Sequence, residues 1–283
     1  GSRDSGGVRG DVNVDVSGLG LGNYRYTAIS GMGHIDGDSY YAELYADDPN
    51  MEFDLYANAE LNEEMPTYMA SLGLRRADLH ALGVNRRDSV SVLEANVGVE
   101  LYGRDIEELS GNISIADIEY LYPQGELHSD RMRMEVESAE AHKSIGIDSD
   151  FFDISYQSHS TYREVYEYIY NSLMTYIPLL YDNAVELGTT SWERNDPRNY
   201  TALSIRANDD VNVFLDAIAS GFVMAPDTKL DMTFNPRSNN ITLRGTSEAI
   251  EYSGVIMANV DLNVNNSSVV SLSLRVKSEG VYL

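Results

Sequence analysis

The residue types that most often carry catalysis or hold metals are dispersed along this chain. The histidines fit neither the H-E-x-x-H nor the H-x-H spacing with which two imidazoles share a metal ion; they are His34, His80, His128, His142 and His159. Two acidic stretches, Asp36-Gly37-Asp38 and Asp47-Asp48, lack the ligand series of an EF-hand loop and are typical of turns. We therefore expect no metal ion and no other cofactor.

Nucleophilic and phosphate-binding motifs do not occur in the sequence either. There is no cysteine, which excludes thiol chemistry and disulfides, and no serine stands in a G-x-S-x-G turn. Gly18, Gly20 and Gly22 are not followed by the Lys-Ser/Thr pair and the helix of a phosphate-binding loop. Pairs of carboxylates are uninformative in a chain with 45 acidic residues. We expect a protein that is not an enzyme.

The formal net charge of −25 restricts the partners of the outer surface. The acidic residues are spread along the chain, and the field they create opposes nucleic acid and anionic lipid, which are bound through Lys and Arg. We expect no nucleic-acid partner. No apolar run approaches the roughly 20 residues that a membrane-spanning helix needs.

Most of the chain alternates between apolar and polar residues, which is the period of a strand with one dry and one wet face. The pattern predicts a mostly β protein in which a long, curved, antiparallel and meandering sheet forms an open apolar groove. The candidate lining residues are the apolar positions of these strands: Met51, Phe53, Leu55, Val97, Val99, Leu101, Ile113, Ile115, Met132, Met134, Val136, Leu230, Met232, Phe234, Ile241, Leu243, Val260, Leu262, Leu272 and Leu274.

What the dry faces touch decides the function. They either meet each other as in a sandwich or curve around a trough that holds something apolar. For each single residue, ordinary core packing is the alternative to groove lining. An acyl chain gains about 0.8 kcal/mol for each CH₂ group removed from water, so a groove of aliphatic, Phe and Met side chains can hold lipid tails. The strongly charged exterior would keep such a protein dispersed.

The parity of the alternation changes near residue 92. Val90 and Val92 share one face of a continuous strand, whereas Leu93, Ala95 and Val97 share the other. A β-bulge shifts a strand in this way, because it inserts one unpaired residue. The sequence therefore predicts a bulge near Val92.

The only long stretch with a helical period is 160–182. Its apolar and aromatic side chains recur every three or four residues, which places them on one helix face. Thr161 and Glu164 have the spacing of a capping box, and Pro178 disfavours a helical conformation at the residue before it. We expect one long helix near 161–177, covering the end of a sheet.

This helix separates two β-rich parts of the chain. The N-terminal Gly1-Ser2 resembles the scar of a cleaved expression tag. We expect the following segments: 1–7, a tag remnant and disordered start; 8–158, an N-terminal β-rich half; 159–187, the central helix and cap; 188–199, a linker loop; and 200–283, a C-terminal β-rich half with a short helix near 210–219.

Three stretches carry a family resemblance, and they occur in the order expected for that family. The first is A-D-D-P-N-M-E-F-D-L-Y-A at 46–57, followed by R-A-D-L-H-A-L at 76–82. The second is F-F-D-I-S-Y-Q-S at 151–158, with the helix ending Y-I-P-L-L-Y. The third is A-P-D-T-K-L-D-M-T-F-N at 225–235, followed by N-N-I-T-L-R-G at 239–245. In this order the chain resembles the TamB family, the translocation and assembly module proteins related to the AsmA-like group, in particular those of Bacteroidetes.

The resemblance implies an internal segment of a larger periplasmic protein that an N-terminal helix anchors in the inner membrane. Family members are similar in rolling a long β-sheet into an open trough with an apolar interior, the β-taco. The implied function is outer membrane biogenesis, either by conducting phospholipids between the inner and outer membranes or by assisting the assembly of outer-membrane proteins. The implied partners are phospholipid acyl chains and, through regions absent from this chain, an outer-membrane barrel assembly partner.

A second hypothesis requires no groove. An extracellular or periplasmic β-sandwich can serve as an interaction module, either an adhesin or a glycan-binding domain. The contact patch would then be formed by surface tyrosines among the 20 that the chain contains. A charge introduced into the apolar interior distinguishes the two hypotheses, because it should abolish lipid transfer but leave glycan binding unchanged.

Overall fold

The computed structural model describes residues 3–4, 7–61, 64–139, 142–176, 200–235, 240–268 and 271–282. Strands make up 68% of the structure, and they pair in an extensive antiparallel arrangement. The expectation of a mostly β, antiparallel protein is therefore confirmed. The predicted linker at 188–199, the Pro178 helix stop and the Gly1-Ser2 pair lie outside the described residues.

The chain forms two compact units, each with its own set of paired strands. Unit 1 is Gly1–Glu135 and unit 2 is Val136–Leu283. The boundary falls inside strand β11 (Gly125–Ala139). The segment boundaries proposed from the sequence, with the central helix as the divider, stay a prediction.

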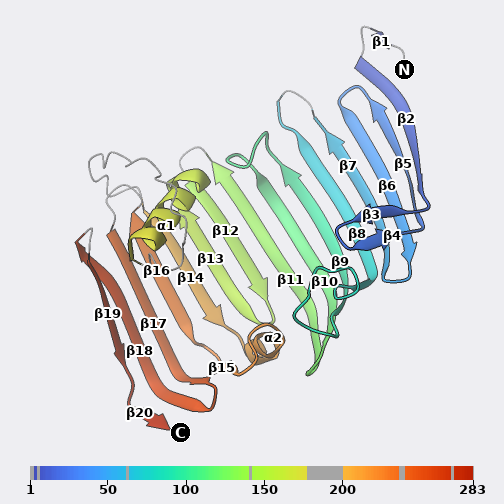
Figure 1. Ribbon diagram of the computed structural model, residues 1–283. Helices are drawn as coiled ribbons and strands as arrows, with labels where there is room; N and C mark the ends of the chain where they lie inside the picture. Colours follow the sequence, from blue (N-terminus) through green and yellow to red (C-terminus); the bar gives the residue numbers. More distant parts are fainter. Residues whose placement is uncertain are drawn as a thin grey trace. The chain divides into compact units, whose positions relative to one another are not determined.

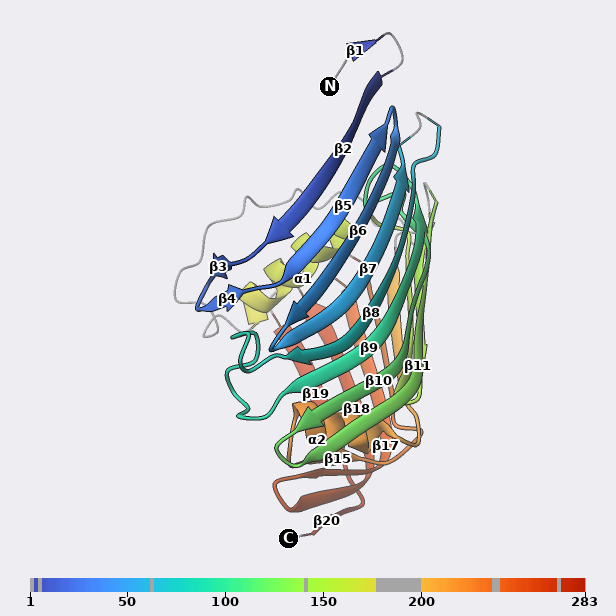
Figure 2. The same cartoon turned by 90° about the vertical axis from the view of Figure 1, so that its right-hand side faces the viewer.

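Unit 1 is an antiparallel meander, because most strands pair with their neighbours in the chain (Figure 1). Strand β2 pairs with β5, and pairing then continues in sequence from β5 to β10. Figure 2 shows these strands side by side, each bending along its length. Strand β1 pairs with β2, and β3 pairs with β4 in a separate hairpin. The strands are β1 (Arg3–Asp4), β2 (Gly7–Val16), β3 (Leu19–Leu21), β4 (Tyr24–Tyr26), β5 (Ile29–Asp36), β6 (Ser39–Asp48), β7 (Met51–Glu60), β8 (Thr67–Asp78), β9 (Val92–Tyr102) and β10 (Ser110–Tyr122).

The unit 1 sheet has one apolar and one polar face, as the alternation requires. Residues directly opposite each other on neighbouring strands share a face. One cross-strand row on the apolar face consists of Leu44, Leu55, Leu72, Val97 and Ile115. The adjacent positions along the same strands point to the other face and form a row of Glu43, Tyr56, Ser71, Gly98 and Ser114.

Three register shifts interrupt this sheet: one between β7 and β8, at Glu52 and Phe53, and two that lie opposite the same part of β9. Strand β8 carries an extra residue between Leu74 and Ala77, and β10 carries one between Ala116 and Glu119. Strand β9 itself begins at Val92. The change of parity that predicted a bulge at Val92 therefore marks the start of the strand, and the bulges belong to its two partners.

A buried carboxylate joins the β3–β4 hairpin to the end of β6. Asp48 is 5% exposed and accepts hydrogen bonds from the Tyr24 hydroxyl and from the N–H groups of Thr27 (2.8 Å) and Asn50 (2.9 Å). The Thr27 hydroxyl donates a further bond to it (2.9 Å). Burial alone raises the pKa of Asp48, but these hydrogen bonds outweigh it and lower the pKa below its ordinary value.

Unit 2 is also antiparallel. Its strands pair in the order β12, β13, β14, β16, β17, β18 and β19, while β15 pairs with the far end of β17 and β20 pairs with β18. Helices α1 and α2 lie toward opposite ends of these strands (Figure 1). The elements are β12 (His142–Ser149), β13 (Phe152–Ser158), α1 (Tyr162–Tyr176), β14 (Thr201–Ala207), α2 (Val211–Ile218), β15 (Phe222–Met224), β16 (Lys229–Asn235), β17 (Asn240–Tyr252), β18 (Val255–Ser268), β19 (Ser271–Lys277) and β20 (Gly280–Tyr282).

Helix α1 starts with a capping box. The N–H of Glu164 donates a hydrogen bond to Thr161 Oγ1 (3.1 Å), and the N–H of Thr161 donates one to the Glu164 carboxylate (3.0 Å). Two backbone donors that have no partner inside the helix are satisfied in this way. The side-chain spacing noted in the sequence thus produces the expected local geometry at the helix start.

The described residues place no second large sheet face to face with the first within either unit, since the β3–β4 hairpin is the one separate sheet among them. A sandwich of the kind that the second hypothesis assumed is therefore not formed within a unit. In unit 2 the two helices take the place of a second sheet over parts of one face.

Candidate functional site

One face of the unit 2 sheet carries two parallel rows of mostly apolar positions. They arise because each strand alternates and the registers align the apolar residues of neighbouring strands. The first row consists of Ile147, Ile154, Ile205, Leu230, Gly245, Leu262 and Val276. The second row, two residues further along each strand, consists of Ile145, Tyr156, Leu203, Met232, Leu243 and Val264.

Helix α2 lies over one end of this face. Its Phe214 ring packs against both Phe151 and Phe152, with ring centroids 5.3 and 5.2 Å apart, respectively. Phe151 is 1% exposed, so it is one of the most deeply buried side chains described. Aromatic contacts of this kind bury a large area, and they fix the helix on the sheet at its β13 side.

A pair of hydrogen bonds attaches α2 to the chain that follows it. The side-chain amide of Asn212 donates to the carbonyl oxygen of Met224 (2.9 Å), and its amide oxygen accepts from the N–H of Met224 (3.0 Å). The Asn212 side chain thus gives the backbone of Met224 in β15 one donor and one acceptor, as a neighbouring strand would. The helix is therefore held both by apolar packing and by a bidentate polar contact.

A pocket of about 470 Å³ lies between α2 and the sheet. This volume falls within the roughly 300–1,000 Å³ of typical small-molecule sites. The lining side chains come from the first row of the alternating pattern, from α2 and from the β17–β18 hairpin, and most are aliphatic or aromatic. They include Ile205, Phe214, Leu215, Leu230, Ile250, Met257, Leu262 and Val276.

Two hydroxyl groups at the pocket, those of Thr228 and Ser247, contact other protein groups. Thr228 Oγ1 and Ser247 Oγ lie 2.7 Å apart and share a hydrogen bond. One of the two hydroxyls donates that bond, and the other donates to the backbone, either Thr228 to the carbonyl of Ala225 or Ser247 to the carbonyl of Ala249 (2.8 Å). Because these polar groups are paired with one another and with the backbone, the pocket offers a mainly apolar surface to a ligand.

Gly245 lies in the floor of the pocket, where a side chain would come close to two leucines. A Cβ atom at this position would lie 3.3 Å from Leu230 Cδ1 and 3.3 Å from Leu262 Cβ. Larger residues would push these two leucines apart or fill the space above the sheet. The glycine therefore contributes to the depth of the pocket.

The other end of the same face is a solid core. Helix α1 buries Val165 and Tyr168, and the Tyr168 ring stacks on Phe234 with centroids 4.9 Å apart. Met232 and Ile241 pack against this cluster. The unit 2 face is thus closed by side chains beneath α1 and hollow beneath α2.

The predicted groove residues of unit 2 whose side chains the structure describes fall into three environments: the pocket, the core beneath α1, and half-buried positions elsewhere on the strands. Leu230, Val260 and Leu262 line the pocket. Met232, Phe234 and Ile241 belong to the α1 core, where Phe234 is 4% exposed. Leu243 lies in the second row, opposite Met232 and Val264, and is half-buried. Val136 is half-buried on β11, and the side chains of Leu272 and Leu274 on β19 lie outside the described part of the chain.

The predicted groove residues of unit 1 are half-buried without exception. They lie on three strands of the meander and on β11: Met51, Phe53, Leu55, Val97, Val99, Leu101, Ile113, Ile115, Met132 and Met134. On β11 the two methionines alternate with exposed Arg131, Arg133 and Glu135. Half-burial of so many apolar residues is typical of a sheet face that no second layer covers.

Several pocket residues were not among the predicted groove residues. Ile205 belongs to β14, whose alternation was visible in the sequence. Phe214 and Leu215 lie on α2, where the helical spacing predicted the element but not what it covers. Ile250 and Met257 lie opposite each other near the β17–β18 turn. Only the pairing of strands brings these residues to one place.

Metal and membrane-spanning features are not found in the part of the chain that the structure describes. Within it, no group of three or more His, Cys, Asp or Glu side chains is placed to hold a metal ion. No helix within the same residues is long and apolar enough to cross a bilayer. His34 contacts Asp11 and His128 contacts Asp130, while His142 and His159 pack ring against ring.

Comparison with known proteins gives no relative from which function can be transferred. The chain matches no protein-family model, no curated protein and no solved structure. The pocket and the two faces of the sheets are therefore the features that bear on function.

Proposed function

We propose that this chain binds lipid acyl chains on its apolar β-surface. In the wider setting that the TamB resemblance implies, it is a segment of a periplasmic protein anchored in the inner membrane. That protein acts in outer membrane biogenesis, by conducting phospholipids between the two membranes or by assisting outer-membrane protein assembly. The proposed ligand is the hydrocarbon tail, not the head group.

The pocket beneath α2 is the observation that supports this proposal most directly. It has a volume of about 470 Å³ and a mainly apolar lining. Burial of about ten CH₂ groups would contribute roughly 8 kcal/mol before the costs of association, so an acyl tail needs no polar contact to bind. Met224 and Met257 at the pocket add flexible side chains that can adapt to tails of different shape.

The apolar face of unit 1 is a second, independent observation that supports the proposal. Its cross-strand row of Leu44, Leu55, Leu72, Val97 and Ile115 remains half-buried, and unit 1 has no helix among its described residues. A protein that keeps such a face must either cover it with a partner or use it to hold apolar molecules. Because lipid tails are apolar along their whole length, they are a suitable ligand both for the pocket of unit 2 and for the apolar face of unit 1.

Filling the pocket tests the proposal without adding a charge to the core. Ile250→Trp places a larger apolar side chain in the pocket, and Ile256→Trp is the matched control on the exposed part of β18 outside it. We expect the purified protein to bind a pyrene-labelled fatty acid, Ile250→Trp to bind it at least about tenfold more weakly, and Ile256→Trp to bind it normally. If the unmodified protein does not bind the fatty acid, or both variants bind equally, the proposal is wrong.

A further inference from the structure

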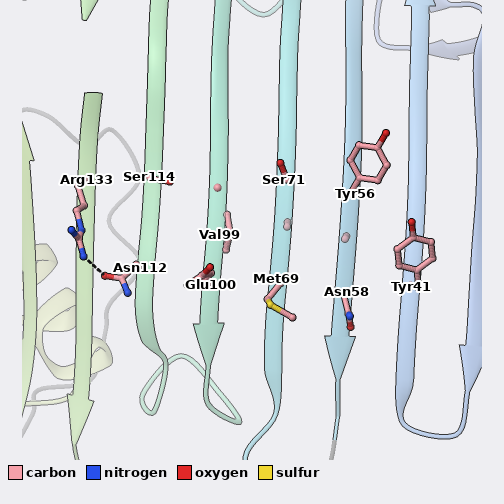
Figure 3. A pocket seen from close by; sticks show the side chains of 13 residues that line it. Tyr41, Tyr56, Asn58, Met69, Ser71, Val99, Glu100, Asn112, Ser114 and Arg133 are labelled. Atoms are coloured by element: carbon pink, nitrogen blue, oxygen red, sulfur yellow. Dashed lines mark hydrogen bonds between the residues drawn. The ribbon is translucent and has the colours of Figure 1, made fainter. Parts of the chain in front are cut away.

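A second hollow lies on the polar face of unit 1, on the opposite side of the sheet from the apolar row. Its volume is about 600 Å³, and it crosses β6, β7, β8, β9 and β10 as far as Arg133 of β11 (Figure 3). From β6 to β10 there are four inter-strand spacings of about 4.8 Å, which gives a length of roughly 19 Å. The hollow is thus long and shallow, in contrast to the covered pocket beneath α2.

The hollow forms a depression in the sheet surface because three neighbouring strands place small residues side by side. Ser71, Gly98 and Ser114 lie directly opposite one another on β8, β9 and β10. A Cβ atom on Gly98 would lie 2.8 Å from Ser114 Oγ, so a larger residue there would displace the Ser114 hydroxyl and raise the floor. The depression is therefore built into the register of the strands.

A group of exposed tyrosines borders one end of the hollow. Tyr41 and Tyr56, 38% and 39% exposed, are lining residues, and Tyr45 stands beside them. Glu43 orients Tyr41 and Tyr45, because the hydroxyls of both donate hydrogen bonds to its carboxylate. The Tyr45 hydroxyl also lies 3.0 Å from that of Tyr56, and the two rings meet edge to face.

The hydrogen bonds among these groups also keep the tyrosines protonated. The bond to Glu43 is the main cause that raises the pKa of Tyr41, and the bond to Tyr56 is the main cause that raises the pKa of Tyr45. Their hydroxyls are committed to these contacts, which leaves the ring faces as the surface offered to a ligand. The tyrosines therefore form an ordered aromatic platform.

The rest of the hollow offers both donors and acceptors. Tyr41, Asn58, Met69, Glu100 and Asn112 form one cross-strand row. Figure 3 shows Arg133 beside Asn112, and their side chains are 3.5 Å apart. Amides supply donors and acceptors, the Glu100 carboxylate accepts and the Arg133 guanidinium donates. A ligand that carries many hydroxyl groups can use all of them.

We infer that this hollow binds a neutral oligosaccharide. Sugar rings have apolar C–H faces that stack on tyrosine and hydroxyls that both donate and accept, which matches a platform followed by mixed polar groups. The net charge of −25, with Glu43 and Glu100 at the hollow itself, disfavours anionic polysaccharides. A peptide added as an extra strand would need a free sheet edge, but β7, β8 and β9 are paired on both sides.

The test uses the complete chain in affinity gel electrophoresis. Native gels contain one soluble polysaccharide each: the neutral probes are dextran, mannan, galactomannan and xyloglucan, and the anionic probes are heparin and polygalacturonate. We expect at least one neutral polysaccharide to retard the protein and neither anionic polysaccharide to do so. Retardation by none of the neutral polysaccharides, or by the anionic ones alone, would overturn the inference.

Neighbouring tyrosines provide a matched pair of variants. Tyr41 lines the hollow, whereas Tyr40 on the same strand points to the other face and is also exposed, at 39%. We expect Tyr41→Ala to weaken retention about tenfold, the loss typical of one aromatic contact of about 1.4 kcal/mol, and Tyr40→Ala to change it little. Equal losses for the two variants would contradict the assigned site.

Two further variants separate this site from misfolding and from the lipid proposal. Ser71→Leu fills the floor of the hollow and should abolish retention at an unchanged thermal unfolding temperature. Ile250→Trp, in the pocket beneath α2, should leave glycan retention unchanged, and Tyr41→Ala should leave fatty-acid binding unchanged. Retention of the glycan by Ser71→Leu would contradict the assigned site, whatever the outcome for lipid.

Discussion

Removal of Asp48 should destabilise unit 1 without touching either proposed site. Asp48 is buried and accepts hydrogen bonds from Tyr24, Thr27 and Asn50, which tie the β3–β4 hairpin to β6. Asp48→Ala leaves these donors without their acceptor, at a cost of about 1–3 kcal/mol for each unsatisfied buried group. Urea unfolding should show a loss of at least that size, whereas exposed Asp47→Ala should stay within about 0.5 kcal/mol of the unmodified protein.

The same carboxylate predicts a dependence of stability on pH. Since hydrogen bonding lowers the pKa of Asp48 in the folded state, its contribution is complete above the ordinary Asp value of about 3.9 and is lost as pH falls through the lowered value. Asp48→Asn lacks this ionised acceptor at every pH. The stability difference between the two proteins should therefore be largest near pH 6 and shrink below about pH 4. A difference that stays constant down to pH 3 would show that ionisation of Asp48 does not matter.

At the scale of elements, we expect the stability of the short helix α2 to depend on Asn212. The helix has eight residues, too few to be stable without tertiary contacts, and its N-cap residue Asp210 makes no side-chain capping bond. Asn212→Ala removes both bonds to Met224, so we expect a loss of about 1–2 kcal/mol in thermal or urea unfolding. Fatty-acid binding should weaken as well, because α2 forms one wall of the pocket.

The control for this prediction lies on the next residue. Val213 belongs to the same helix and is 39% exposed, so Val213→Ala changes helix composition without removing an anchor. Its effect on stability should be below about 0.5 kcal/mol. If Val213→Ala and Asn212→Ala prove equally destabilising, the bidentate contact does not hold the helix.

Local patterns in the sequence were enough to predict the types of element. Alternation at Met51, Phe53 and Leu55 produces β7, and the capping box of Thr161 and Glu164 produces the start of α1. These features depend on residues that are close in the chain, so one sequence contains the whole signal. The bulge predicted near Val92 was wrong, because a strand that bulges and a strand that begins produce the same change of parity in the sequence.

The candidate sites could be predicted only in part, because they depend on which distant strands pair. Leu230 and Phe234 have the same parity on β16, yet one lines the pocket beneath α2 and the other is buried beneath α1. Nothing in the local alternation distinguishes them. The hollow on unit 1 depends likewise on the register that aligns Ser71, Gly98 and Ser114, and register is a property of pairs of strands.

At the scale of the whole molecule, the proposed lipid binding makes net charge a factor in how the protein would approach a membrane. A charge of −25 repels a bilayer that contains anionic lipid, and the repulsion acts over the Debye length. Apolar pockets bind tails only after the protein has approached the bilayer surface. Charge should therefore control the rate of lipid uptake, while the pocket controls how much lipid is held.

Ionic strength separates these two contributions. The Debye length falls from about 30 Å at 0.01 M to about 8 Å at 0.15 M salt, which screens repulsion between the protein and an anionic vesicle. We expect the rate at which the protein extracts pyrene-labelled phosphatidylcholine to rise several-fold over this range when the vesicles contain phosphatidylglycerol. With vesicles of phosphatidylcholine alone, the rate should change little, because the surface carries no net charge.

Pocket variants complete this experiment. Ile250→Trp should lower the amount of lipid extracted from both kinds of vesicle without changing the salt dependence, because it alters the pocket and not the net charge. Ile256→Trp should behave like the unmodified protein in both respects. An extraction rate that falls as salt is added would mean that a local cationic patch attracts the bilayer, and the repulsion inferred from the net charge would then be the wrong description of how this protein approaches lipid.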